Sequence, residues 1–193
     1  KVNYACEDDD NIYVAMPFYK NGSLKKRISD NNYLTVREVI RYSIQFLSGL
    51  NHIHSKGLIH FDIKPDNVLI SDSNEAMLSD FGLALYTDAY GFCEAQASYT
   101  PHVTPEQLLG LKQTIKNDIY QAGLTIYRMV NGNDFFYRQI PNSGNLMLDN
   151  IAFKRLVQLG LFPNRKSYLP HVPKKIKKII KKCIEPDPND RYD

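Results

Sequence analysis

The segment "HFDIKPDN", His60 to Asn67, places two carboxylates, a lysine and a side-chain amide within eight residues. Another acid, Asp80 in "SDFG", follows Asn67 thirteen positions later. Carboxylate and amide oxygens suit a hard cation such as Mg²⁺, and a lysine can neutralise negative charge on a substrate. These residue types at this spacing could therefore form a site that binds a metal ion and an anion.

The same eight residues also fit a solvated turn. Pro65 would set the bend, and Asp66 and Asn67 would supply the side-chain hydrogen bonds that are typical of turns. The apolar residues on either side, Ile59 before and Val68 to Ile70 after, fit both interpretations. The remainder of the chain is needed to choose between them.

Composition narrows the class of protein. With 193 residues, 43% of them hydrophobic and 23% charged, the chain can form one well-buried core and is typical of soluble globular proteins. The net charge of +3 does not indicate a nucleic-acid partner or a membrane partner. No apolar run is long enough for a membrane span, and the N-terminus is unlike a signal peptide.

The cysteines indicate a compartment. Cys6, Cys93 and Cys183 are scattered along the chain and form no Cys-x-x-Cys pair. This pattern argues against a disulfide framework and a cysteine zinc site, and it fits a reducing environment. We therefore expect a cytoplasmic or nuclear protein.

Apolar periodicity predicts mainly helical structure. Thr35 and Glu38 have the spacing of a capping box, and the apolar residues after them recur at helical period until Gly57, which is suited to end a helix. These apolar residues are Val36, Val39, Ile40, Phe46, Leu47, Leu50 and Ile53. Further helices are expected over 117–132 and 152–161, with irregular segments at 83–103 and 131–145.

Short strands accompany the helices. The run 12–18 reads as a strand, and the runs 67–70 and 75–78, joined by "SDSN", read as a β-hairpin.

A basic run near the C-terminus carries six lysines between positions 174 and 182, a composition that could suit nucleic acid. Its apolar residues, however, fall at i, i+3, i+4, i+7 and i+8, which predicts one buried stripe with the lysines facing water. These residues are Ile176, Ile179, Ile180, Cys183 and Ile184. We therefore favour an amphipathic surface helix and expect no nucleic-acid partner.

Followed by "DFG" (Asp80 to Gly82), the 60–67 segment resembles the catalytic loop and metal-binding loop of the eukaryotic-type protein kinases. Other landmarks occur in the order of that family: "GLNHIHSKGLIH" before the loop, and "TPE", "NDIYQAG" and "DPNDR" after it. The resemblance covers nearly the whole chain. It implies a mainly α fold, the helical large lobe of a kinase with short β-hairpins and a remnant of the small-lobe sheet. Residues 1–19 would end the small lobe and form the hinge, and 20–193 would form the large lobe.

The resemblance assigns roles in phosphoryl transfer from ATP. Asp62 would orient the attacking hydroxyl and accept its proton, and Lys64 would neutralise charge on the transferring phosphate. Asn67 and Asp80 would hold Mg²⁺. For adenine, Met16 would be the gatekeeper, backbone groups of Pro17 and Tyr19 would bond the purine edge, and Leu69 would form the floor. A plain edge strand over 12–18 is the alternative for the hinge residues.

Six further residues would support the site: His60, Phe81, Gly82, Glu106, Asp118 and Arg191. Glu106 and Arg191 would form a buried ion pair between the substrate loop and the helical lobe. Asp118 would accept backbone N–H bonds from the loop near His60 and Phe61, unless it is an ordinary helix cap.

Lys64 together with "TPE" resembles the kinases that phosphorylate serine or threonine in proteins. Two other functions stay open: a pseudokinase that serves as a binding module, and a small-molecule kinase. The intact set Asp62, Lys64, Asn67 and Asp80 argues against the first. Lys64 and "TPE" argue against the second.

Two departures from the family pattern bear on regulation. Phe61 stands where the family has an arginine that pairs with a phosphate on the activation loop. No lysine or arginine occurs from Pro65 to Leu111. We therefore expect that phosphorylation of Thr87, Ser98, Tyr99 or Thr100 does not switch the enzyme on. In "SYTPHVTPE", the usual Gly, Thr and Tyr are replaced by Ser98, Tyr99 and His102.

The 193 residues contain no Gly-x-Gly-x-x-Gly run and no strand resembling Val-Ala-x-Lys. The resemblance places both in the small lobe, where they grip the ATP phosphates. We therefore expect this segment alone to have negligible activity and a complete kinase that contains it to be active.

Overall fold

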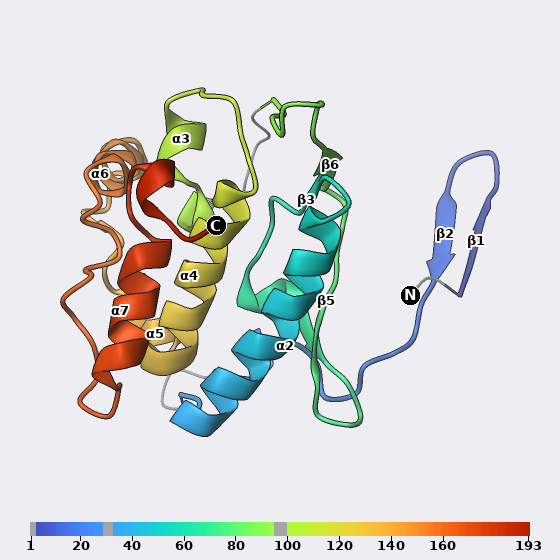
Figure 1. Cartoon of the computed structure of the whole chain (residues 1–193), viewed down its shortest axis with the longest axis horizontal. Helices are drawn as coiled ribbons and strands as arrows, with labels where there is room; N and C mark the ends of the chain where they lie inside the picture. Colours follow the sequence, from blue (N-terminus) through green and yellow to red (C-terminus); the bar gives the residue numbers. More distant parts are fainter. Residues whose placement is uncertain (1–2, 29–32, 95–99) are drawn as a thin grey trace.

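The computed structural model describes residues 3–28, 33–94 and 100–193 of the chain. A body of packed helices holds most of the chain, and a β-hairpin of the first residues stands apart from it (Figure 1). The helices are α1 (Leu24–Arg27), α2 (Val36–His54), α3 (Pro105–Leu108), α4 (Lys116–Asn131), α5 (Asn133–Tyr137), α6 (Leu146–Gln158) and α7 (Lys174–Cys183). The mainly α fold expected from the sequence is confirmed.

The strands are short and pair as antiparallel couples. They are β1 (Tyr4–Glu7) with β2 (Ile12–Ala15), β3 (Leu58–Ile59) with β6 (Leu85–Tyr86), and β4 (Val68–Ile70) with β5 (Ala76–Leu78). Three short 3-10 helices complete the structure: η1 (Pro65–Asn67), η2 (Thr100–His102) and η3 (Pro188–Asp190). The predicted hairpin of 67–70 with 75–78 is therefore present as β4 and β5.

Helix α2 begins where the sequence predicts. The Thr35 hydroxyl accepts the Glu38 N–H at 3.3 Å, and the Glu38 carboxylate accepts the Thr35 N–H at 2.9 Å, so the capping box is complete. The helix ends at His54, and Gly57 follows with φ 71°, a left-handed conformation that glycine adopts without strain.

Helix α4 is the centre of the helical body, with α2 on one side and α7 on the other (Figure 1). Every residue from Tyr120 to Asn131 is buried. The contact with α7 requires Gly123, because a Cβ there would lie 2.6 Å from Cys183 Cβ and 2.7 Å from Ile184 Cγ2. A helix this deeply buried can hold polar side chains only where they find partners, and those partners are in the candidate site.

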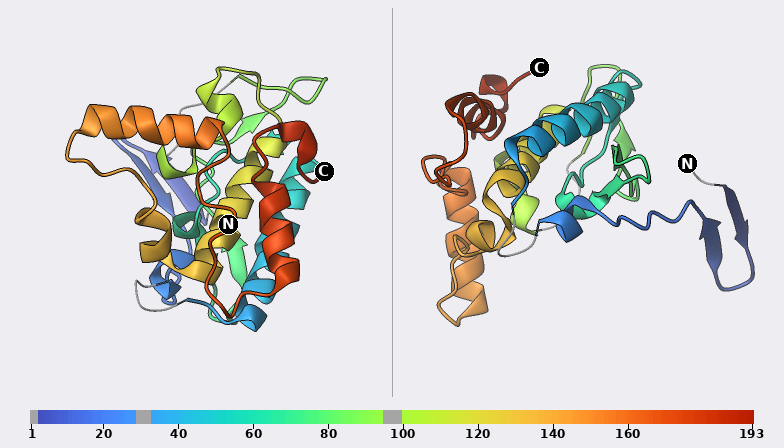
Figure 2. Two further views of the ribbon diagram at one scale, coloured as in Figure 1. Left: turned by 90° about the vertical axis from the view of Figure 1, so that its left-hand side faces the viewer. Right: turned by 90° about the horizontal axis from the view of Figure 1, so that it is seen from below.

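The segment that follows the β1–β2 hairpin returns to the helical body. Figure 2 shows it as an extended connection before α1. Gly22 accepts the Ile70 N–H at 2.8 Å, and Ser23 forms a β-bridge with Leu69. Leu24, the first residue of α1, is fully buried. The chain is thus anchored beside β4.

Several expectations about the elements were wrong. The segment 131–145 contains helix α5, because Phe136 is buried against Tyr127 and Phe162. Strand β6 lies in the expected loop 83–103, where it pairs with β3. Helix α6 begins at Leu146, six positions before the expected start at Ala152. Its cap is Asn145, which accepts backbone N–H bonds from Met147 and Leu148.

Two apolar residues assigned to buried helix faces are exposed. Ile40 on α2 is 47% exposed and Ile179 on α7 is 44% exposed, whereas Ile176, Ile180 and Ile184 are buried as expected. The strand expected over 12–18 ends at Ala15. Among the described residues, no helix combines the length and the apolar character needed to cross a membrane.

Candidate active site

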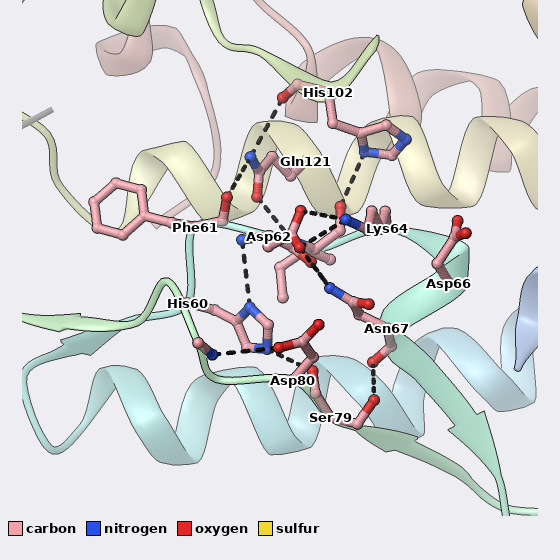
Figure 3. A network of polar contacts seen from close by, with 12 residues as sticks. His60, Phe61, Asp62, Lys64, Asp66, Asn67, Ser79, Asp80, His102 and Gln121 are labelled. Carbon is pink, nitrogen blue, oxygen red and sulfur yellow. Dashed lines mark hydrogen bonds and ion pairs between the residues drawn. The ribbon is translucent and has the colours of Figure 1, made fainter. Parts of the chain in front are cut away.

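The candidate site is built on the His60–Asn67 segment, called the polar loop below. The loop leaves β3, passes through η1 and enters β4, so paired strands fix both of its ends. The Asp62 carboxylate accepts hydrogen bonds from Lys64 Nζ at 2.7 and 2.9 Å and from Asn67 Nδ2 at 2.7 Å. Asn67 Nδ2 also donates to the Asp62 carbonyl at 3.0 Å. Three of the four predicted residues thus share one network (Figure 3).

Asp80 reaches the same place from the end of β5. The residue before it, Ser79, donates both its N–H and its hydroxyl to the Asn67 carbonyl, each at 2.9 Å. Asp80 has φ 60°, an uncommon conformation for a residue other than glycine, and its carboxylate is exposed beside Asn67 (Figure 3). The structure therefore brings together all four residues to which the sequence assigned chemistry.

His60 is a neutral link between the polar loop and the Asp80 segment. Its Nε2 lies 3.1 Å from the Ser79 carbonyl, and its Nδ1 lies 3.4 Å from the Asp62 N–H. Burial lowers the pKa of His60, although the nearby Asp118 carboxylate opposes this shift. This network assigns the proton to Nε2. The His60 ring also contacts the Phe81 ring, with centroids 4.8 Å apart.

Asp118, at the start of α4, holds the first residues of the polar loop. It is fully buried and accepts the backbone N–H groups of His60 and Phe61, each at 2.8 Å. His54 Nε2 lies 2.8 Å from the same carboxylate. These contacts match the sequence prediction. They also explain Phe61, whose φ of 66° is strained for an aromatic residue and needs support from its surroundings.

Sequence reasoning missed a second group of supporting residues on α4. Gln121 and Thr125 are fully buried and hydrogen-bonded to the polar loop, and Arg128 is fully buried against His102. Together with Asp118, they occupy positions i, i+3, i+7 and i+10 of the helix. A polar stripe at helical period on an otherwise apolar helix was the signal that could have identified them.

The expected ion pair of Glu106 with Arg191 is present. Arg191 Nη1 and Nη2 contact the two Glu106 carboxylate oxygens at 2.7 and 2.8 Å, and both side chains are almost fully buried. Arg191 also donates to the carbonyls of Lys116, Glu185 and Pro186. The pair therefore has the additional hydrogen bonds that a buried ion pair needs.

Comparison with known proteins decides the family. The model of the protein kinase domain matches residues 1–193, the whole chain. This chain belongs to the protein kinase domain family.

The relatives include kinases of both hydroxyl specificities. A probable serine/threonine-protein kinase of Clostridium acetobutylicum is 29% identical over 187 residues, which cover 95% of this chain and 27% of that protein. Serine/threonine-protein kinase PrkC of Bacillus subtilis is 31% identical over 97% of this chain and 28% of its own length. Tyrosine-protein kinase Src64B of Drosophila melanogaster is 33% identical over 72% of this chain and 25% of its own length. The chain thus spans about a quarter of the length of these curated relatives.

The oxygen atoms of this kinase site fit a magnesium ion. Asn67 uses its amide N–H₂ group on Asp62, and its Oδ1 has no protein hydrogen-bond partner among the described residues. The Asp80 carboxylate is exposed and accepts the Gly82 N–H at 3.4 Å. Amide and carboxylate oxygens, completed by phosphate oxygens and water, are the ligands that Mg²⁺ prefers. Within the described residues, no cluster of three or more His, Cys, Asp or Glu side chains is placed to hold a metal, so such an ion would depend on phosphate oxygens.

The residues expected around adenine are less closely assembled. Leu69 lies on β4, and Tyr19 accepts the Gly22 N–H in the turn that precedes the bridge to β4. Met16 is 59% exposed on the extended connection to the β1–β2 hairpin, and Pro17 is partly buried. The structure therefore brings Tyr19 near β4 but leaves Met16 facing solvent. The adenine-binding role of these four residues stays a prediction.

Proposed function

We propose that the full-length gene product transfers the γ-phosphate of ATP to serine or threonine hydroxyls of proteins. The observation that carries this proposal is the buried Asp62 carboxylate, held by Lys64 and Asn67 next to the exposed Asp80. Membership of the protein kinase domain family and the names of the bacterial relatives support it. We also propose residues 1–19 as the end of a small lobe and its hinge, and residues 20–193 as the large lobe.

The roles follow from the contacts. Phosphoryl transfer needs positioning and charge stabilisation more than covalent chemistry from the protein. Asp62, with its carboxylate fixed by two donors, would accept the hydrogen bond of the attacking hydroxyl and orient its oxygen. Lys64 is close enough to Asp62 to neutralise charge at the same point. Mg²⁺, when held by Asn67 and Asp80, would supply positive charge to the phosphate oxygens.

The test is a transfer assay with the full-length gene product. The protein is incubated with γ-labelled ATP, Mg²⁺ and mixed protein substrates, in parallel with the variants Asp62→Asn and Asp72→Asn. Asp62→Asn should lower kcat by about 10²–10⁴-fold because the proton acceptor is lost. Asp72→Asn is the matched control, since Asp72 lies on the exposed turn between β4 and β5, and it should retain wild-type kcat.

Two outcomes would contradict the proposal. Nucleotide binding without label transfer would indicate a pseudokinase that acts as a binding module. Label found only on tyrosine, or only on small molecules, would keep the enzyme class and refute the serine/threonine acceptor. Phosphoamino-acid analysis of the products separates these outcomes.

A further inference from the structure

Gln121 lies on α4 one turn after Asp118, with its side chain directed at the polar loop (Figure 3). It is fully buried. Its Oε1 accepts the Ile63 N–H at 2.9 Å, and its Nε2 donates to the Phe61 carbonyl at 2.9 Å. Phe61 and Ile63 are the neighbours of Asp62. One amide group therefore holds the backbone on both sides of the residue that would orient the substrate hydroxyl.

The strained backbone at Phe61 makes this contact important. Phe61 has φ 66°, and its N–H is bound by Asp118 while its carbonyl is bound by Gln121. A residue in an uncommon conformation persists only where its surroundings hold it. Without Gln121, the Phe61 peptide would keep one anchor, and the direction in which Asp62 leaves the backbone would no longer be fixed.

Gln121 also joins the polar loop to the segment that precedes α3. Its Nε2 donates to the His102 carbonyl at 3.3 Å. The His102 ring returns to the loop, with Nδ1 2.9 Å from the Ile63 carbonyl. Thr125 Oγ1 donates to the same carbonyl at 3.3 Å. Each of these groups is fully buried, so water cannot replace a lost partner.

We propose that Gln121 is a positioning residue for phosphoryl transfer, which orients Asp62 and couples it to the segment ending at His102. The inference rests on the proposed kinase activity and adds a residue to it. Gln121 acts through the backbone of Phe61 and Ile63 and does not itself touch the reacting atoms.

The experiment compares three variants of the full-length gene product at a temperature where each is folded by circular dichroism. Gln121→Met keeps the side-chain length and removes the amide, and Gln121→Glu keeps the acceptor for Ile63 and loses both donated bonds. Gln45→Met is the matched control, because the Gln45 amide accepts the Ala76 N–H on the outer hairpin and lies outside the site.

Gln121→Met should lower kcat about a hundredfold, since a small misplacement of a catalytic group has an effect of this size. The KM for ATP should stay within about twofold, because the residue orients the hydroxyl side of the reaction. Gln45→Met should leave both constants at wild-type values.

A pH profile of Gln121→Glu provides a second readout. The protonated Glu can donate one hydrogen bond and the ionised Glu none, so kcat relative to wild type should rise about tenfold per unit as the pH falls through the pKa of the new carboxyl. Burial and the carboxylates raise that pKa, and the cations lower it. The charged and titratable groups around the position are His60, Asp62, Lys64, His102, Asp118, Arg128 and His54. The Gln121→Met ratio should stay flat over the same range, because those groups are common to all variants.

Each alternative outcome overturns the inference. If Gln121→Met lowers only the melting temperature and the folded variant has wild-type kcat, the residue is merely structural and the proposed function stands. If the ratio for Gln121→Glu does not change with pH, the donated bonds do not act on Asp62. Absence of transfer by the wild type would refute the proposed function itself, and the inference with it.

Discussion

At the scale of single residues, the groups proposed to do chemistry are held by groups that are themselves neutral. His102 is the clearest case. It lies fully buried between the Ile63 carbonyl and the Arg128 guanidinium, which is 3.0 Å from its Nε2. Burial lowers the pKa of His102 well below its usual value of 6.5, and Arg128 adds to the shift. A protonated His102 would place a second positive charge against Arg128 and lose the acceptor at Nε2.

This arrangement predicts a pH dependence of stability. Below about pH 6.5 the unfolded chain binds a proton at His102 and the folded chain does not, so the free energy of unfolding falls as the pH falls. Each such group contributes about 1.4 kcal/mol per pH unit. His102→Gln should reduce the slope between pH 6.5 and 5 by about that amount in urea unfolding. The exposed His52→Gln serves as the matched control. Equal slopes for wild type and His102→Gln would contradict the prediction.

At the scale of elements, the Glu106–Arg191 pair joins helix α3 to the segment after η3. Helix α3 begins at a capping box of Thr104 and Gln107, and Glu106 lies in its first turn. Arg191 comes from the other end of the chain and stacks over Tyr120 of α4, 4.7 Å from the ring centroid. Three elements therefore meet at one buried pair.

Breaking this pair should destabilise the whole helical body. Glu106→Gln leaves the Arg191 charge buried without a counter-charge, which costs about 3–5 kcal/mol of unfolding free energy. Glu185→Gln is the control, because Glu185 pairs with Arg165 at a partly exposed site and should lose only about 0–1 kcal/mol. Urea unfolding of both variants measures the difference. Losses of similar size would show that burial does not determine the strength of the pair.

At the scale of the whole molecule, the segment 83–104 has its own means of attachment to the site. Strand β6 pairs with β3, and Cys93 forms a β-bridge with Gln113. His102 contacts the polar loop directly. Phe61, at the position of the family's phosphate-binding arginine, is fully buried and carries no charge. The described part of this segment is thus attached through backbone and buried contacts, and none of these contacts involves a phosphate.

The predicted consequence is an enzyme that does not depend on phosphorylation of this segment. Replacing Thr87, Ser98, Tyr99 and Thr100 together with alanine should change kcat by less than about threefold, because Phe61 offers a phosphate no charge-assisted bond. Ser98 and Tyr99 lie outside the described residues. The variant is assayed beside wild type treated with phosphatase, which should also keep its activity. A hundredfold loss in either sample would refute the prediction.

Local signals were sufficient for many elements. The capping box of Thr35 and Glu38 acts over three residues, and the apolar period that marks α2, α4 and α7 acts over turns of a single helix. The polar loop and Asp80 were identified from their residue types and spacing through the family resemblance. The contacts of Asp118 with the loop and of Glu106 with Arg191 were expected from the same resemblance and are present.

The sequence by itself therefore determined the types and approximate places of the main helices, the β4–β5 hairpin and the chemical groups of the site. Only the tertiary structure decided that Phe136 would be buried in a helix, that Ile40 and Ile179 would stay exposed, and that Gln121 would hold the backbone around Asp62. The physical reason is range. Capping and periodicity depend on neighbours within a turn or two, whereas the partner of Gln121 is 60 residues away and is set by how α4 packs beneath the loop.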